Sequence, residues 1–120
     1  MRLIKSGGTR WVLLTRKYAI KFPIPKTWKT FVQGMLSNLT EGQWKDYPDK
    51  HLCPIHYSNR FGLLVVMARA SKVNNEGLFW CELESLYHSC ELSREFYEYD
   101  AFPKNFGYYK GRLVKIDYGV

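Results

Sequence analysis

The sequence has no long apolar run, and its longest, Phe61 to Ala68, is far shorter than the roughly 20 residues that a membrane-spanning helix needs. The opening residues, Met1 to Lys5, lead into the polar stretch Ser6-Gly7-Gly8-Thr9 instead of the apolar core of a secretory signal. We therefore expect neither a membrane anchor nor a membrane partner.

Cysteines are few and do not form a paired pattern. The chain has three, Cys53, Cys81 and Cys90, and an odd set without regular spacing argues against a disulfide framework or a Cys-x-x-Cys metal site. We expect free, buried thiols in a reducing compartment, which predicts a cytoplasmic protein.

Acidic residues are also scarce relative to basic ones. The sequence contains 11 Asp and Glu against 18 Lys and Arg, a formal net charge of +7, which excludes a wholesale mimic of nucleic acid. Such a surface attracts polyanions, namely nucleic acid, nucleotide phosphates or an acidic protein. With 120 residues, of which 46% are apolar, the chain is expected to fold as one domain spanning 1–120.

The hydrophobic pattern predicts an α+β fold. Alternating strands interrupted by turn residues indicate an antiparallel five-stranded sheet, with one helix after the third strand and a second helix after the fifth. A turn-rich segment and a terminal hairpin follow. The expected strands are Met1 to Lys5, Arg10 to Thr15, Tyr18 to Phe22, Leu52 to Tyr57, Leu63 to Ala68 and, in the hairpin, Tyr108-Tyr109 with Arg112 to Ile116.

The two helices are predicted from apolar residues at helical spacing. Thr27 is the expected N-cap of the first helix, which is expected to pack on the sheet. Glu41 lies on a polar stripe with Gly34, Asn38 and Lys45, roughly opposite Val32, so one regular helix would not aim both Glu41 and the apolar stripe at the same sheet. The second helix has its apolar face around Phe79, Leu83 and Leu86 and is expected to end near Phe96. The stripe of the first helix comprises Trp28, Phe31, Val32, Met35, Leu36 and Leu39.

Read in order, several short motifs resemble those of the protein-kinase superfamily. Tyr18-Ala19-Ile20-Lys21 is similar to the family's Val-Ala-Ile-Lys strand, and Glu41 on the following helix is the candidate partner of Lys21. Asp100 and Asn105 keep the Asp-x-x-x-x-Asn spacing of the kinase catalytic loop. Asp117-Tyr118-Gly119 resembles the Asp-Phe-Gly motif. The resemblance spans nearly the whole chain and implies a sheet like that of the kinase N-terminal lobe.

The resemblance also implies roles for individual residues. Lys21 would neutralise nucleotide phosphates, Glu41 would orient it, and Asp100 would orient the attacking hydroxyl. Asn105 and Asp117 would bind magnesium, which prefers oxygen ligands. The residues that would contact ATP are Lys21, Gly7, Gly8, Met67 and Ala68. Taken singly, Lys21 and Glu41 could instead be solvated surface charges, and Asp100 and Asp117 ordinary turn residues.

The chain departs from the kinase pattern in ways that bear on activity. Its glycine-containing loop is short, Glu98-Tyr99 stands where the family has His-Arg, and the sequence ends at Val120, just after the Asp-Phe-Gly-like motif. We therefore expect a truncated, kinase-like and non-catalytic protein that binds and modulates a macromolecular partner, such as a phage-type inhibitor of a host complex. The alternative is a minimal ATP- and magnesium-dependent phosphotransferase.

A second alternative is binding of nucleic acid. Basic residues near the C-terminus alternate with aromatic ones, a combination that suits single strands because charge attracts the backbone and rings stack on bases. Self-association also remains open, because apolar surface not covered by a second lobe would be exposed. The basic and aromatic residues concerned are Lys104, Lys110, Arg112, Lys115, Phe106, Tyr108 and Tyr109.

Overall fold

A computed structural model describes residues 2–4, 8–99 and 101–118 of the protein. The chain forms two compact units, and each is described by itself. Unit 1 comprises residues 1–46, 54–69 and 118–120, and unit 2 comprises residues 47–53 and 70–117. Whether the two units fold as one domain stays a prediction.

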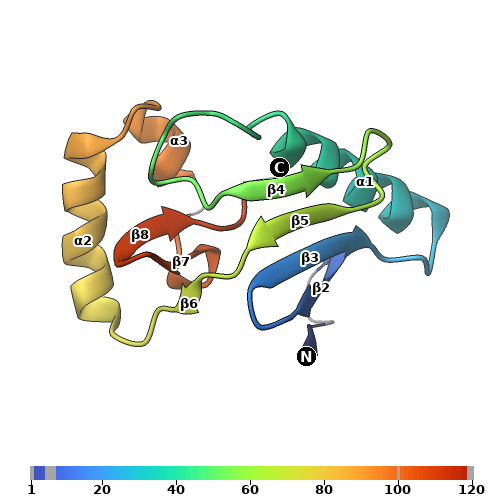
Figure 1. Ribbon diagram of the computed structural model, residues 1–120, viewed down its shortest axis with the longest axis horizontal. Helices are drawn as coiled ribbons and strands as arrows, with labels where there is room; N and C mark the ends of the chain where they lie inside the picture. The colour runs from blue at the N-terminus through green and yellow to red at the C-terminus, as the bar shows by residue number, and fades with distance from the viewer. Residues whose placement is uncertain (1, 5–7, 100, 119–120) are drawn as a thin grey trace. The chain divides into compact units, whose positions relative to one another are not determined.

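Unit 1 is built on an antiparallel sheet of five strands in the order β1-β2-β3-β5-β4 (Figure 1). The strand β3 lies in the centre, with its residue Lys21 opposite Val12 of β2 and Val65 of β5. The strands are β1 (Arg2–Ile4), β2 (Arg10–Leu14), β3 (Tyr18–Pro23), β4 (Ile55–Ser58) and β5 (Val65–Ala68).

The helix α1 (Trp28–Gly42) packs on this sheet, against β3, β4 and β5. The Thr27 side chain accepts a hydrogen bond from the Thr30 backbone N–H and so begins the helix as predicted. The most deeply buried side of the helix is its polar one. Gly34, Asn38 and Glu41 are buried, whereas Trp28 is 78% exposed and Leu36 is 56% exposed.

The helix therefore packs on the sheet as expected, but chiefly through its polar side, while most of the apolar stripe is only half-buried, and Gly34 shows why. A Cβ at this position would lie 2.5 Å from the Thr9 carbonyl oxygen and 2.6 Å from the Pro23 Cβ. The helix backbone thus approaches the strands more closely than any larger side chain would allow. Close approach on this side brings Asn38 and Glu41 to the sheet and turns Leu36 outward.

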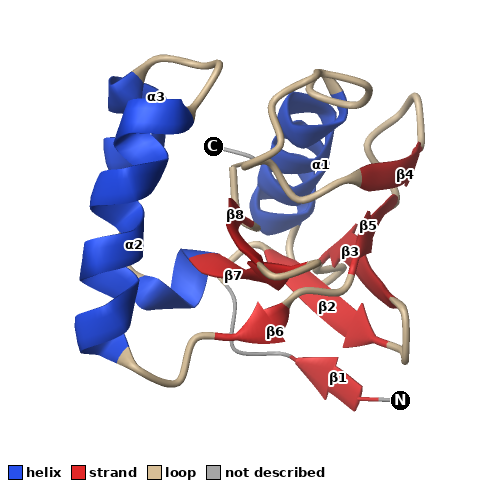
Figure 2. Cartoon of the chain, turned by 60° about the vertical axis from the view of Figure 1, so that its left-hand side comes forward, coloured by secondary structure: helices blue, strands red, loops and turns tan. Residues whose placement is uncertain are grey.

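Unit 2 combines a three-stranded antiparallel sheet, in the order β6-β7-β8, with two helices (Figure 2). Its core contains Phe79, Leu83 and Leu86 of α2, together with Phe106 and Val114 of the terminal hairpin. The elements are β6 (Ser71–Lys72), α2 (Glu76–Ser89), α3 (Arg94–Glu98), the 3₁₀ helix η1 (Pro103–Asn105), β7 (Phe106–Tyr109) and β8 (Arg112–Lys115).

The second predicted helix is two helices in the structure. α2 ends at Ser89, and the next residue, Cys90, has an extended backbone. The Ser93 side chain then caps α3 by accepting a hydrogen bond from the Phe96 N–H. The capping serine provides a new helix start, which the apolar spacing alone does not indicate.

The predicted fold class is confirmed: an α+β structure with a five-stranded antiparallel sheet, a packed helix, a second helical segment and a terminal hairpin. In the described part of the chain, no helix has the length and apolarity needed to cross a membrane. The expectation that all three cysteines are buried was wrong, because only Cys53 is buried, Cys90 is half-buried and Cys81 is exposed.

Candidate functional site

The candidate site lies in unit 1, where β3 directs Lys21 toward α1. Along β3, alternate side chains are buried, and Ala19, Lys21 and Pro23 share the buried face. Lys21 is only 6% exposed, so it is not a solvated strand lysine. A buried ammonium group requires a partner, because removal of a charge from water is costly unless the charge is paired.

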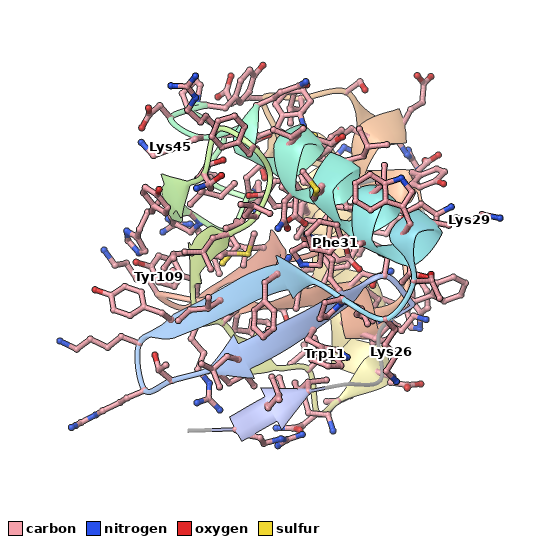
Figure 3. The ribbon with its side chains drawn as sticks, turned by 90° about the vertical axis from the view of Figure 1, so that its right-hand side faces the viewer. Trp11, Lys26, Lys29, Phe31, Lys45 and Tyr109 are labelled. Carbon is pink, nitrogen blue, oxygen red and sulfur yellow. The ribbon has the colours of Figure 1, made fainter. Side chains whose placement is uncertain are left out.

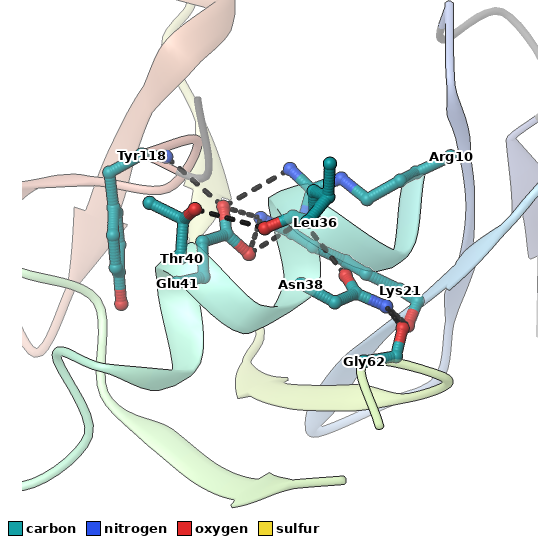
Figure 4. Close-up of polar contacts among 8 residues, drawn as sticks. All are labelled: Arg10, Lys21, Leu36, Asn38, Thr40, Glu41, Gly62 and Tyr118. Carbon is teal, nitrogen blue, oxygen red and sulfur yellow. Dashed lines mark hydrogen bonds and ion pairs between the residues drawn. The ribbon is translucent and has the colours of Figure 1, made fainter. Parts of the chain in front are cut away.

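Glu41 is that partner and is itself fully buried. The Lys21 Nζ lies 3.0 Å from Glu41 Oε2 and 3.2 Å from Oε1. The predicted Lys21–Glu41 pair is therefore present (Figure 4). Gly34, two turns earlier on the same side of α1, allows the helix to come close enough for this contact.

A third charged residue, Arg10 at the start of β2, completes the cluster. Its guanidinium contacts both oxygens of Glu41, at 2.7 Å and 3.1 Å. The backbone N–H of Tyr118 also donates to Glu41 Oε2, at 3.1 Å. The carboxylate thus accepts five hydrogen bonds, from Arg10, Lys21 and Tyr118 (Figure 4). We call Arg10, Lys21 and Glu41 the buried ion cluster.

Asn38 connects this cluster to the backbone. Its carbonyl oxygen accepts a hydrogen bond from Arg10 at 3.0 Å. Its amide nitrogen donates to the carbonyl oxygens of Gly62, at 2.9 Å, and Lys21, at 3.3 Å. One side chain therefore links α1 to β2, β3 and the loop that precedes β5.

The cluster strongly favours the ionised form of Glu41. Burial by itself raises the pKa of the carboxyl, but the positive charges of Lys21 and Arg10, and their hydrogen bonds, outweigh it. As a result, the pKa of Glu41 falls from 4.5 to about 2. Glu41 is thus a permanent carboxylate that holds two cations in place, and it is unsuited to act as a general base near neutral pH.

The other predicted contact residues of unit 1 lie on the sheet or beside it. Met67 and Ala68 are buried in β5, and Met67 is paired with Ala19 across the sheet. Gly8 has open space around its Cβ position, which leaves its backbone approachable. Gly7 lies outside the described residues. The ATP-contacting role of these residues stays a prediction.

The residues predicted to bind magnesium belong to unit 2. Asn105 is buried at the end of η1, and its carbonyl oxygen accepts a hydrogen bond from the Ile116 N–H at 2.9 Å. This bond places Asn105 beside the segment that contains Asp117, which is exposed. Their oxygen atoms are of the kind that magnesium prefers. Asp100, the predicted catalytic aspartate, lies outside the described residues.

A cluster of His, Cys, Asp and Glu that could hold a metal ion is absent from the described residues. Asparagine is not one of these residue types, so Asn105 and Asp117 remain the predicted ligands. The same two residues would hold the metal through amide and carboxylate oxygens, and the metal would neutralise phosphate charge when bound.

The basic stripe suggested for nucleic-acid binding is interrupted in the structure. Lys115 is buried, and its ammonium group donates to the carbonyl oxygens of Phe96, at 2.8 Å, and Tyr99, at 3.1 Å. Phe106 is also buried. Neither residue is available at the surface, because β7 and β8 direct these side chains inward. Lys104 and Lys110 remain exposed.

The sequence interpretation missed Arg10 and Asn38. Asn38 lies on the same polar stripe of the helix as Gly34 and Glu41, and this stripe is visible in the sequence. Its position beside Glu41 indicates that Asn38 would lie near the same partners. Arg10 stands shortly after two glycines in the sequence, but its distance from Glu41 depends on the register between β2 and β3. Local sequence does not specify that register.

The geometry therefore gives a buried ion cluster in unit 1 and two candidate magnesium ligands in unit 2. Protein-family models, curated proteins and solved structures were all compared with this chain, and none of them matches it.

Proposed function

We propose that the chain is a kinase-like, non-catalytic protein that acts by binding and modulating a macromolecular partner. Two features of unit 1 support the kinase-like part of this proposal. An antiparallel five-stranded sheet with one packed helix is the arrangement that the resemblance implies, and so is the contact between Lys21 and Glu41. The odd number of cysteines, without paired spacing, favours placing the protein in a reducing cytoplasm.

The proposal that the protein binds a partner rests on the outward side of α1. Trp28, Val32 and Leu36 are four residues apart and form one ridge along the helix, which we call the outward ridge. Trp28 and Leu36 are two of the large apolar side chains that unit 1 exposes. Exposed apolar side chains that lie together commonly mark an interaction surface.

The ion cluster supports binding by fixing the helix that presents this ridge. Glu41 joins α1 to β2 and β3 through Arg10 and Lys21. A helix held in this way presents its ridge in one orientation, and a rigid surface loses little conformational entropy on binding. In this proposal the ancestral catalytic pair has a structural role.

Affinity capture with paired variants tests the proposal. The natural chain, Leu36→Asn and Gln33→Asn would each be immobilised and exposed to a lysate of the native cell. Gln33 is exposed on the same helix three residues before Leu36, and its replacement removes no apolar side chain, so Gln33→Asn is the matched control. We expect one stoichiometric protein to be retained by the natural chain and the control and lost from Leu36→Asn. Equal retention by all three would contradict binding through the ridge.

A second candidate function is ATP- and magnesium-dependent phosphotransfer. The specific observation in its favour is that two cations, Lys21 and Arg10, are held beside one another by a permanent carboxylate. Fixed positive charge of this kind suits the binding of phosphate.

Thermal unfolding with ATP and magnesium tests this candidate. A ligand that binds only the folded state raises the melting temperature. The candidate predicts a rise for the natural chain that is lost in Lys21→Met and kept in Lys17→Met, since Lys17 is exposed in the turn before β3. No rise in the natural chain would reject it.

A further inference from the structure

The charge of the chain is divided very unevenly between the two units. Unit 1 contains 11 of the 18 Lys and Arg residues and two of the 11 Asp and Glu residues, a formal charge of +9. Unit 2 contains the remaining seven basic and nine acidic residues, a formal charge of −2. The basic character of the protein is therefore a property of unit 1.

The two acidic residues of unit 1 do little to offset this charge at its surface. Glu41 is buried between Arg10 and Lys21. Asp46 is exposed and lies 3.5 Å from the ammonium group of Lys45. The exposed charged side chains of unit 1 are thus almost all basic, and a positive potential attracts negative partners and repels positive ones.

Individual basic side chains also lie next to exposed apolar ones. Lys29 is exposed on α1 next to Trp28 and extends away from the strands (Figure 3). Arg60 places its guanidinium 4.9 Å from the centre of the exposed Phe61 ring. The residue after Phe61, Gly62, packs against the backbone of α1, so this pair belongs to a loop that borders the helix.

From these observations we infer that the outward ridge binds an acidic, amphipathic segment of another protein. This inference rests on the proposed function and specifies its partner. The apolar residues of the segment would cover Trp28, Val32 and Leu36, and its Asp and Glu side chains would face Lys29 and the surrounding basic surface. The ridge is about 12 Å long, which corresponds to roughly two turns of a partner helix.

Other occupants suit the ridge less well. A second copy of the chain would bring one unit of formal charge +9 against another, which is unfavourable. Nucleic acid would match the charge, but bases stack on aromatic rings, and the middle and end of the ridge are the aliphatic Val32 and Leu36. An acidic, amphipathic protein segment suits both, because its carboxylates match the basic charge and its apolar side chains match the aliphatic surface.

Photo-crosslinking identifies the occupant directly. The probe is p-benzoylphenylalanine, placed at position 36 in one variant and at Arg16, an exposed residue in the turn after β2, in the control. Both full chains would be irradiated in a lysate of the native cell, and the attached peptides sequenced by mass spectrometry. The control carries the probe on the same basic unit away from the ridge.

We expect position 36 to be joined to a protein segment in which Asp and Glu outnumber Lys and Arg. The yield should fall about tenfold or more between low and high salt, because attraction between exposed charges is screened. A neutral or basic segment, a second copy of the chain, a phospholipid or a nuclease-sensitive adduct would each overturn the inference.

The result also separates this inference from the proposed function. If position 36 captures one protein through a segment that is not acidic, the inference fails and the proposed function stands. If position 36 captures nothing beyond what Arg16 captures, the proposed use of the ridge fails as well. Capture of an acidic segment at position 36 and not at position 16 supports both.

Discussion

Unit 1 and unit 2 bury their charged side chains in different ways. In unit 1, Glu41 is paired with two cations from different strands, Arg10 and Lys21. In unit 2, the carboxylate of Asp49 accepts hydrogen bonds from the backbone N–H groups of Glu91 and Leu92, at 3.0 Å and 2.9 Å. Unit 1 pairs its buried carboxylate with cations from other elements. Unit 2 satisfies its buried carboxylate with hydrogen bonds from backbone N–H groups.

The difference shows which contacts fix each unit. The Glu41 cluster joins α1 to the sheet and thereby determines which side of the helix faces outward. Asp49 instead fixes the loop between α2 and α3, and His51 adds contacts to the Leu113 carbonyl and the Ser89 hydroxyl, both at 2.9 Å. Loss of a charge should therefore have a larger effect in unit 1 than in unit 2.

The largest effect is expected for Glu41→Gln. This change leaves Arg10 and Lys21 buried without their carboxylate, and breaking a buried ion pair costs about 3–5 kcal/mol. Denaturation by urea would measure the loss in the free energy of unfolding. Asp46→Asn is the matched control in the same unit, because the Asp46 side chain is 86% exposed, and it should change that free energy by less than about 0.5 kcal/mol. Equal stability of the two variants would contradict the cluster's role.

Acid is expected to lower the free energy of unfolding by about 3 kcal/mol. The pKa of Glu41 is lowered from 4.5 to about 2 in the folded protein, so the unfolded chain takes up this proton first as pH falls. The stabilisation is complete above pH 4.5 and is lost as pH falls from there to about 2. Urea midpoints measured across this range should fall more steeply for the natural chain than for Glu41→Gln. Parallel curves would show that Glu41 is not the group responsible.

A smaller effect, about 2 kcal/mol, is expected for Asp49→Asn in unit 2. Burial raises the pKa of Asp49, but hydrogen bonds from the Tyr97 hydroxyl and from backbone N–H groups outweigh it and lower the pKa below 3.8. Asparagine removes the charge and one acceptor, but no buried cation is left behind. Hydrogen exchange at the amides of Glu91 and Leu92 should become faster, while exchange in β3 stays unchanged. Unchanged exchange at both amides would contradict this account of the loop.

Much of the fold could be predicted from the sequence because its signals are local. Alternation in β3 and the Thr27 cap each depend on neighbouring residues, and both appear in the structure. The Lys21–Glu41 pair was also predicted, through the resemblance to kinases. Whether the chain shares kinase ancestry stays a proposal.

The orientation of α1 could not be predicted in the same way. An apolar stripe normally faces the core, and the rule fails here because Gly34 allows a closer approach on the polar side. This close approach depends on Thr9 and Pro23, which lie next to Gly34 only in the folded sheet. Arg10 was missed for a similar reason, since its contact with Glu41 spans 31 residues.

The central claim is that α1 buries its polar side and exposes the outward ridge, and one comparison of unfolding free energies tests it. Leu36→Asn should cost less than about 1 kcal/mol, since the side chain is 56% exposed. Asn38→Leu should cost about 2–4 kcal/mol, because it removes one of the buried acceptors of Arg10 and the buried amide that donates to the Gly62 carbonyl. The reverse order, with a costly Leu36→Asn and a neutral Asn38→Leu, would show that the apolar stripe faces the sheet and would contradict both the site and the proposed binding surface.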